Sequence, residues 1–316
     1  MRNSSRRGFM KTAGMTALLS SMGTHKAFSQ GTSNKQSTSR HNFDEHFNRI
    51  GHNSDKWDLI IQQYGREKIK ASMGVADMDF RQFSEVNSAL RERTKYENYG
   101  YEMVPDSYYQ SIINWNEQRY GQSIKKEWIK NSATLLPSIT ASLVGLNPHK
   151  GKVIIQTPTY SGFWGAIKRA GMTRVEVPLK QNNGKFSMDL AAVERAFDDD
   201  TKCLIICNPN NPTGTAWSAD ELKALGDLCI KHGVTVLSDE IHCDFIRKDK
   251  KFTPYSSLGE KYANTSITYR SSSKTFSQSS LCVAHFFTQN EDLMRATMKT
   301  HRTACNTYGL LACEVA

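Results

Sequence analysis

Short apolar runs alternate with helical patterns from about residue 152 onward, and this alternation constrains the fold more than any other feature. The runs are rich in Val, Ile, Leu and Cys, as are strands that are buried on both faces of a sheet. They lie at Lys152–Gln156, Cys203–Cys207, Val234–Ser238, Ser266–Tyr269 and Cys282–Phe287, and helical patterns lie at 84–94, 105–120, 162–170, 189–197 and 218–232. We therefore predict an α/β fold with a mostly parallel central sheet flanked by helices.

Polar and aromatic side chains follow these predicted strands at the points where the strands end. Tyr160 follows the first strand, Asn211 the second, Asp239 and His242 the third, and Lys274 the fourth. Ligands of parallel α/β sheets bind beyond the carboxyl ends of the strands. We therefore expect an aromatic ring, an amide, a carboxylate, an imidazole and an amine to meet at one edge of the sheet.

The lysine lies in the stretch Tyr269–Phe276, directly behind three serines. A turn there places hydroxyl and backbone N–H groups beside the amine, so an oxyanion can bind next to it. This combination suits pyridoxal 5'-phosphate (PLP), which needs an amine for its aldehyde and hydrogen-bond donors for its phosphate. A solvated Ser/Lys turn is the alternative interpretation of this stretch taken by itself.

Five segments together resemble the fold-type I PLP-dependent enzymes of the class I/II aminotransferase superfamily. Within that superfamily the chain is most similar to the cystathionine β-lyase (cysteine-S-conjugate β-lyase) branch. The segments are Val75-Ala76-Asp77-Met78-Asp79-Phe80, Tyr99-Gly100-Tyr101, Asn208 to Gly214, Ser238-Asp239-Glu240-Ile241-His242-Cys243-Asp244 and Ser273-Lys274-Thr275-Phe276. The resemblance extends from about Asn42 to the end of the chain, and it implies the PLP-transferase fold of type I.

The resemblance implies a role for each residue at the strand ends. Lys274 would bind PLP covalently and then act as the general base that removes the Cα proton of the substrate. Asp239 would keep the pyridine nitrogen protonated, and Tyr160 would stack on the ring. Asn211 and His242 would hydrogen-bond the 3-oxygen of the ring. The alternatives are a helix N-cap for Asp239 and a core aromatic for Tyr160.

The resemblance also implies how the phosphate is held. Ser271, Ser273 and the backbone N–H groups of Thr134 and Leu135, at a helix start, would surround it. In the family a tyrosine of the neighbouring subunit also reaches the phosphate, and Tyr101 matches that tyrosine. A homodimer with shared active sites is therefore expected.

The implied reaction is α,β-elimination on L-cystathionine or a related L-cysteine S-conjugate, which yields a thiol, pyruvate and ammonia. His242 favours this branch because transaminases of the superfamily usually have tyrosine at that position. An aminotransferase on the same scaffold and a non-catalytic PLP-binding descendant are the alternatives. Ser271-x-x-Lys274 also has the spacing found in penicillin-binding hydrolases, but the Ser-Asp-Asn and Lys-Thr-Gly tripeptides of those enzymes do not occur.

The N-terminus predicts export. Arg6-Arg7-Gly8-Phe9-Met10-Lys11 precedes a mildly apolar, acid-free run, and Ala27-Phe28-Ser29 offers a cleavage site. This arrangement resembles a twin-arginine signal, which implies the twin-arginine machinery and a periplasmic or other extracytoplasmic location; a basic surface helix is the alternative.

The signal carries five basic residues and no acid, so removing it lowers the net charge of the chain from +10 to +5. That excess is not concentrated in one run and gives no indication of nucleic-acid binding, and no apolar run is long enough to span a bilayer.

We expect a signal peptide at 1–29, a flexible leader at 30–41, an N-terminal arm and small-domain segment at 42–80, and a large PLP-binding domain at 81–305. Residues 306–316 resemble the start of the interdomain helix, beyond which the family carries the arginine that binds the substrate carboxylate. We therefore expect a fragment with only a partial small domain.

The seven cysteines are odd in number and form no C-x-x-C pair, so they are predicted to be buried free thiols. They are Cys203, Cys207, Cys229, Cys243, Cys282, Cys305 and Cys313.

Overall fold

The computed structural model describes residues 42–100, 103–147 and 149–304. The contacts divide the chain into two units, Met1–Asn42 and Phe43–Ala316, and every helix and strand below belongs to the second. The predicted signal peptide and leader, the segment 306–316, Tyr101, Cys305 and Cys313 lie outside the described residues. Within the described ranges, no helix is both long and apolar enough to cross a membrane.

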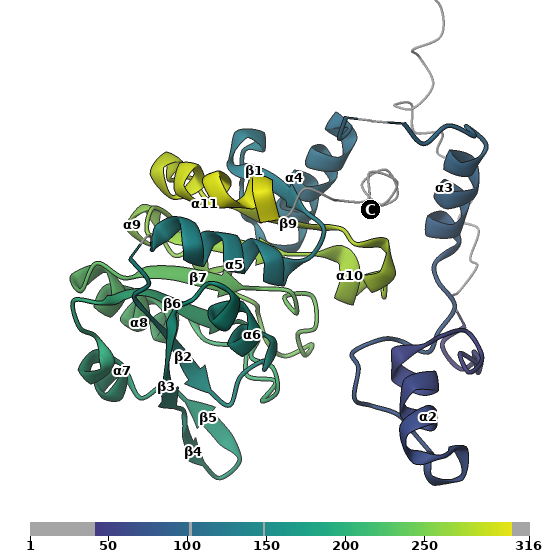
Figure 1. Ribbon diagram of the computed structural model, residues 1–316, viewed down its shortest axis with the longest axis horizontal. Coiled ribbons are helices and arrows are strands. Elements are labelled where there is room, and N and C mark those ends of the chain that lie inside the picture. The colour runs from purple at the N-terminus through teal and green to yellow at the C-terminus, as the bar shows by residue number, and fades with distance from the viewer. Residues whose placement is uncertain (1–41, 101–102, 148, 305–316) are drawn as a thin grey trace, which may run out of the picture. The chain divides into compact units, whose positions relative to one another are not determined.

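A seven-stranded, mostly parallel sheet forms the centre of the large unit (Figure 1). Strand β9 is antiparallel to its neighbours β8 and β1, whereas β8, β7, β6, β2 and β3 are parallel to one another. This arrangement confirms the predicted fold class. In spatial order the strands are β1 (Ile129–Ser132), β9 (Ala284–Phe287), β8 (Ser266–Arg270), β7 (Thr235–Asp239), β6 (Thr201–Cys207), β2 (Lys152–Thr157) and β3 (Thr173–Pro178).

Helices cover both faces of the sheet because alternate side chains of its central strands are apolar on both sides. Ile155 and Ile205 point to one face, which is covered by α5 (Leu135–Leu146), α6 (Gly162–Arg169) and α11 (Glu291–Ala304). Ile154 and Leu204 point to the other face, which is covered by α7 (Leu190–Ala196), α8 (Ala219–Lys231) and α9 (Glu260–Ala263). Figure 1 shows the two layers of helices with the sheet between them. This burial on both sides holds the strand ends rigidly.

The part of the chain before the sheet forms short helices. It contains η1 (Asp55–Leu59), α2 (Ile60–Tyr64), η2 (Arg66–Lys68), α3 (Ser84–Thr94) and α4 (Asp106–Tyr120). Helix α4 packs Tyr108 and Ile112 against β1 and β9. The bounds of α3 and α4 agree with the predicted helices at 84–94 and 105–120. The remaining short elements are η3 (Lys126–Trp128), β4 (Lys180–Asn182), β5 (Lys185–Ser187), η4 (Tyr255–Ser257), α10 (Ser272–Thr275) and η5 (Ser279–Leu281).

Two predictions were wrong at Cys282. The last strand begins at Ala284 and not at Cys282, because Cys282 has a φ of 55°, in the left-handed region that ends η5. The same turn exposes this thiol, whereas Cys203, Cys207, Cys229 and Cys243 are buried and free as predicted. The buried thiols pack as small apolar side chains, and burial raises their pKa.

Candidate functional site

A cavity of about 590 Å³ lies beyond the carboxyl ends of β6, β7 and β8. Strand β3 follows β2 along the chain and lies on one side of it in the sheet, whereas the next strand, β6, lies on the other side of β2. The direction of the connections therefore reverses between β2 and β6, and sheets of this type bind ligands at such a switch point. Nine of the ten residues predicted for the site line this cavity, namely Thr134, Leu135, Tyr160, Asn211, Asp239, His242, Ser271, Ser273 and Lys274. The tenth, Tyr101, lies outside the described residues.

Asp239 supplies a buried carboxylate to this cavity. It is the last residue of β7 and is 3% exposed. Burial raises the pKa of Asp239 to about 7. The hydrogen bond that the Ile241 N–H donates to Oδ1 at 3.0 Å opposes this rise, and the negative charge of Glu240 adds to it. Among the described residues no cation pairs with this carboxylate. A turn and not a helix follows it, so the N-cap interpretation was wrong. A cationic N–H group in the cavity would restore the charged form of Asp239.

Lys274 reaches the cavity from the single turn of α10. Ser271 caps this turn, since its hydroxyl accepts a hydrogen bond from the Ser273 N–H at 2.9 Å and donates one to the Val283 carbonyl at 2.6 Å. The Lys274 Nζ donates to the carbonyl of Ala76 at 3.4 Å. The amine therefore lies between the sheet edge and the segment that contains Val75 and Ala76, at an exposed contact.

An ionic cluster anchors that segment in turn. Asp79 pairs with Lys56 at 2.8 Å and accepts from the Trp57 indole N–H at 3.0 Å. Burial opposes ionisation of Asp79, but these two hydrogen bonds lower its pKa. The backbone N–H of Met78 donates to the Ser277 hydroxyl at 3.1 Å, which joins the segment to the chain just after the lysine.

His242, Asn211 and Tyr160 lie around the same cavity. Burial, and then the positive charge of Lys274, lower the pKa of His242, so its imidazole is neutral at pH 7. The backbone N–H of Asn211 donates to the sulfur of Cys207, the last residue of β6, at 3.4 Å, which positions Asn211 at the end of that strand. Tyr160 is 39% exposed and meets Phe163 edge to face, so the core-aromatic interpretation was wrong.

The start of α5 supplies donors for an anion. Thr134 is the N-cap residue, and its side chain makes no capping hydrogen bond. The first N–H groups of a helix have no intrahelical acceptors, and they carry a partial positive charge. Thr134 and Leu135 line the cavity together with Ser271 and Ser273, so this end suits a phosphate group.

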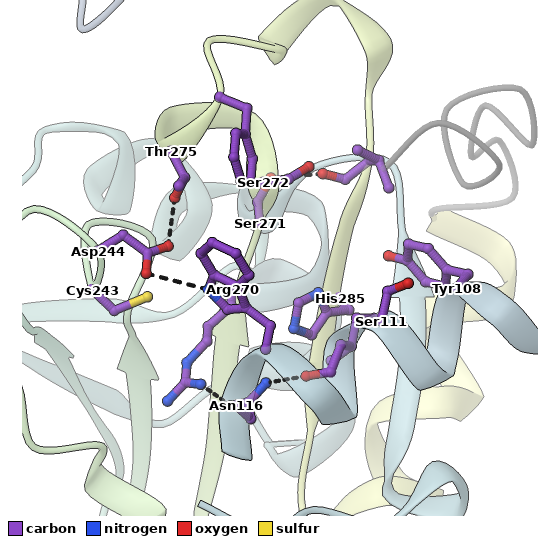
Figure 2. Close-up of a pocket in the computed structure, with 14 residues that line it drawn as sticks. Tyr108, Ser111, Asn116, Cys243, Asp244, Arg270, Ser271, Ser272, Thr275 and His285 are labelled. Carbon is purple, nitrogen blue, oxygen red and sulfur yellow. Dashed lines mark hydrogen bonds between the residues drawn. The ribbon is translucent and has the colours of Figure 1, made fainter. Parts of the chain in front are cut away.

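Two further contacts join the strand ends that carry Asp239 and Lys274. Arg270 donates from Nε and Nη2 to Oε2 of Glu240, at 2.9 and 2.6 Å, and both side chains are buried. Thr275 donates to Asp244 at 2.7 Å. Figure 2 shows this second contact, and it shows Arg270 directed at Asn116, around a smaller cavity of about 170 Å³.

Sequence reasoning missed Arg270, Glu240 and Asp244 as supports of the site. The available signal was a charged residue, Arg270, at the end of an otherwise uncharged predicted strand, because a buried charge requires a partner.

The groups that line the cavity of about 590 Å³ at the sheet edge fit PLP. A lysine amine can meet the aldehyde, a carboxylate without a cation can meet the pyridine nitrogen, and hydroxyl and N–H donors can meet the phosphate. A family model of class I and II aminotransferases matches residues 68–312, which is most of the chain. The chain belongs to the class I and II aminotransferase family.

Relatives within this family include carbon–sulfur lyases. Cystathionine beta-lyase PatB of Bacillus subtilis is 34% identical over 236 residues, which cover 74% of this chain and 61% of PatB. Cystalysin from Treponema denticola, whose structure contains PLP, is 28% identical with a TM-score of 0.82 over 87% of this chain and 71% of that one. The PLP-bound C-S lyase from Staphylococcus hominis is 30% identical with a TM-score of 0.80 over 88% of this chain and 71% of that one.

These similarities establish the type I PLP-transferase fold. The chain spans less than two thirds of the length of the curated relatives, namely 61% of PatB, 52% of MalY from Escherichia coli and 64% of a cystathionine beta-lyase from Corynebacterium glutamicum.

Proposed function

We propose that the chain forms the cofactor-binding part of a PLP-dependent carbon–sulfur lyase that acts on L-cystathionine or a related L-cysteine S-conjugate. The observation that carries this proposal is that Asp239, His242 and Lys274 line one cavity at the sheet edge. Membership of the family supports PLP as the cofactor. Similarity to PatB, cystalysin and the C-S lyase supports elimination as the reaction.

Bound PLP supplies an aldehyde that links to the amino group of the substrate and a ring that delocalises the electron pair left at Cα. Asp239 accepts a hydrogen bond from the ring N–H and keeps that nitrogen protonated. Neutral His242 and Asn211 are the hydrogen-bond partners for the 3-oxygen, and Tyr160 offers its ring for stacking. The donors at the start of α5 hold the phosphate.

Lys274 carries out the proton transfer. Its amine takes the proton from Cα, and the electron pair of that bond drives cleavage of the Cβ–S bond. The sulfur leaves with the electron pair of the Cβ–S bond and takes up a proton, which gives the thiol. The three-carbon remainder reacts with one water to give pyruvate and ammonia. No oxidant or reductant is consumed in these steps.

Two further proposals concern assembly and location. We infer a homodimer in which Tyr101 of one subunit reaches the phosphate of the other, in support of which Tyr99-Gly100-Tyr101 resembles the corresponding family segment. We also infer export by the twin-arginine pathway, supported by Arg6-Arg7 ahead of the mildly apolar run.

The proposed function is tested by adding L-cystathionine to the purified PLP-loaded protein. We expect pyruvate and L-homocysteine in equal amounts without any added ketoacid. Borohydride reduction should fix the cofactor on Lys274, as detected by peptide mass spectrometry, and not on Lys261, an exposed control lysine paired with Asp227. An aminotransferase, the alternative that the family itself favours, would instead require a ketoacid and release no thiol. A protein that fixes no cofactor would contradict both.

A further inference from the structure

A second cavity, of about 610 Å³, adjoins the proposed active site, and we name it the side cavity. It is lined by residues of the segments 47–55, 75–77 and 274–280. Val75, Lys274 and Ser279 line both cavities. Because the amine that takes the Cα proton lies at the junction, a substituent that extends from the substrate beyond the lysine can enter the side cavity.

The lining of the side cavity carries both signs of charge. Arg49 directs Nη2 to Asp77 at 3.2 Å and Nη1 to the carbonyl of Met78 at 3.4 Å, and its side chain is 22% exposed. Asp55 contributes a second carboxylate, which is exposed. Such a lining suits a ligand group with one positive and one negative charge, and it disfavours an alkyl group, which would strip water from these charges without replacing their hydrogen bonds.

Ser54 provides an independent indication of a ligand. The residue is 7% exposed, and its hydroxyl is buried with no hydrogen-bond partner among the described residues. Its backbone groups are satisfied, since its N–H donates to Asp58 at 2.8 Å and its carbonyl accepts from the Asp58 N–H at 2.7 Å. Unsatisfied buried hydroxyls are rare because they lose their hydrogen bonds to water, and Ser54 is one of the residues that line the side cavity.

We propose that the side cavity binds the amino-acid end of the leaving thiol, that is, the distal ammonium and carboxylate of a thioether such as L-cystathionine. Ser54 and Arg49 donate to the distal carboxylate, and Asp55 and Asp77 accept from the distal ammonium. This inference rests on the proposed function and narrows its substrate class to thioethers whose two halves are both amino acids.

The test compares L-cystathionine with S-ethyl-L-cysteine, which has the same reacting end and an apolar leaving group. Calorimetry on PLP-loaded Lys274→Ala protein measures binding without turnover. We expect L-cystathionine to bind more tightly, and Ser54→Ala in the same background to weaken that binding about tenfold, the value of a hydrogen bond to a charged group. Binding of S-ethyl-L-cysteine should not change. Ser111→Ala is the matched control, since that hydroxyl donates to the Ser107 carbonyl on α4.

Equal affinities for the two thioethers, or an equal loss for both on Ser54→Ala, would overturn the inference. With Lys274 present, Ser54→Ala should raise KM for L-cystathionine and leave kcat unchanged, because the contact is made equally before and during the reaction. The proposed function is judged separately by pyruvate release from L-cystathionine. Pyruvate release together with equal affinities for the two thioethers keeps the lyase and rejects the side-cavity assignment. Unequal affinities without any pyruvate release reject the lyase, and with it the assignment of the side cavity to a leaving thiol.

Discussion

The buried pair of Arg270 and Glu240 gives the most quantitative prediction. Arg270→Met removes a cation that is 4% exposed and leaves the Glu240 carboxylate, which is 0% exposed, without its two guanidinium donors. Removing one partner of a buried ion pair costs about 3–5 kcal/mol because the remaining charge is uncompensated. If the free energy of unfolding falls by about 3 kcal/mol for each 1 M of urea, the unfolding midpoint should fall by about 1–1.7 M.

A second substitution tests whether the uncompensated charge of Glu240 causes the loss of stability in Arg270→Met. Glu240→Gln removes the charge but keeps an oxygen for the Ser238 hydroxyl and the Tyr255 N–H, which now donate to Oε1 at 3.0 and 2.8 Å. The double variant Arg270→Met/Glu240→Gln should therefore be more stable than Arg270→Met alone.

Urea unfolding followed by circular dichroism measures both variants. Arg247→Met is the control, since Arg247 pairs with Asp249 on the surface, where such pairs contribute little, and its midpoint should not move. A fall of less than about 0.3 M for Arg270→Met, or a double variant whose loss equals the sum of the two single losses, would refute the reasoning.

Three further predictions follow from single positions. In the cofactor-free protein the pKa of Asp239 is raised to about 7, so the stability of the wild type relative to Asp239→Asn should fall by about 3 kcal/mol between pH 4 and pH 7, as measured by urea unfolding at each pH; a constant difference would contradict this. Gly145→Ala places a Cβ against the Ala296 carbonyl and should cost about 1–3 kcal/mol, whereas Gly74→Ala, with open space around it, should be tolerated; equal melting temperatures would refute the packing argument. Lys274→Ala should lower pyruvate release at least about 100-fold and prevent fixation of the cofactor by borohydride, and a variant that retained either would place the base elsewhere.

The central sheet was predictable because the inner strands are apolar on both faces, a pattern that few other structures produce. Strands β6, β7 and β8 therefore lie within two residues of their predicted bounds. Strand β3 was not predicted because most of its residues are exposed at the sheet edge. Helix α5 was not predicted in full because Pro137 and Gly145 interrupt its pattern, although its start at Leu135 was.

The site residues at the strand ends were predictable for a geometric reason. Parallel strands bring their carboxyl ends to one edge, so Asp239 and Lys274 had to lie near each other once the strands were placed. The partner of Arg270 was not predictable, because Glu240 and Arg270 are 30 residues apart and meet only through strand pairing. Ser54 gave no signal either, since its burial depends on how distant segments fold around it.

The hydrogen bond between Lys274 and Ala76 joins residues that are 198 positions apart. A ribosome adds about 5–20 residues per second, so about 10–40 seconds separate the synthesis of the two partners. Ala76 leaves the exit tunnel long before the lysine exists, and throughout that interval its carbonyl lacks the donor that it contacts in the folded chain. Newly made chains at this stage are the form that a nascent-chain chaperone would meet.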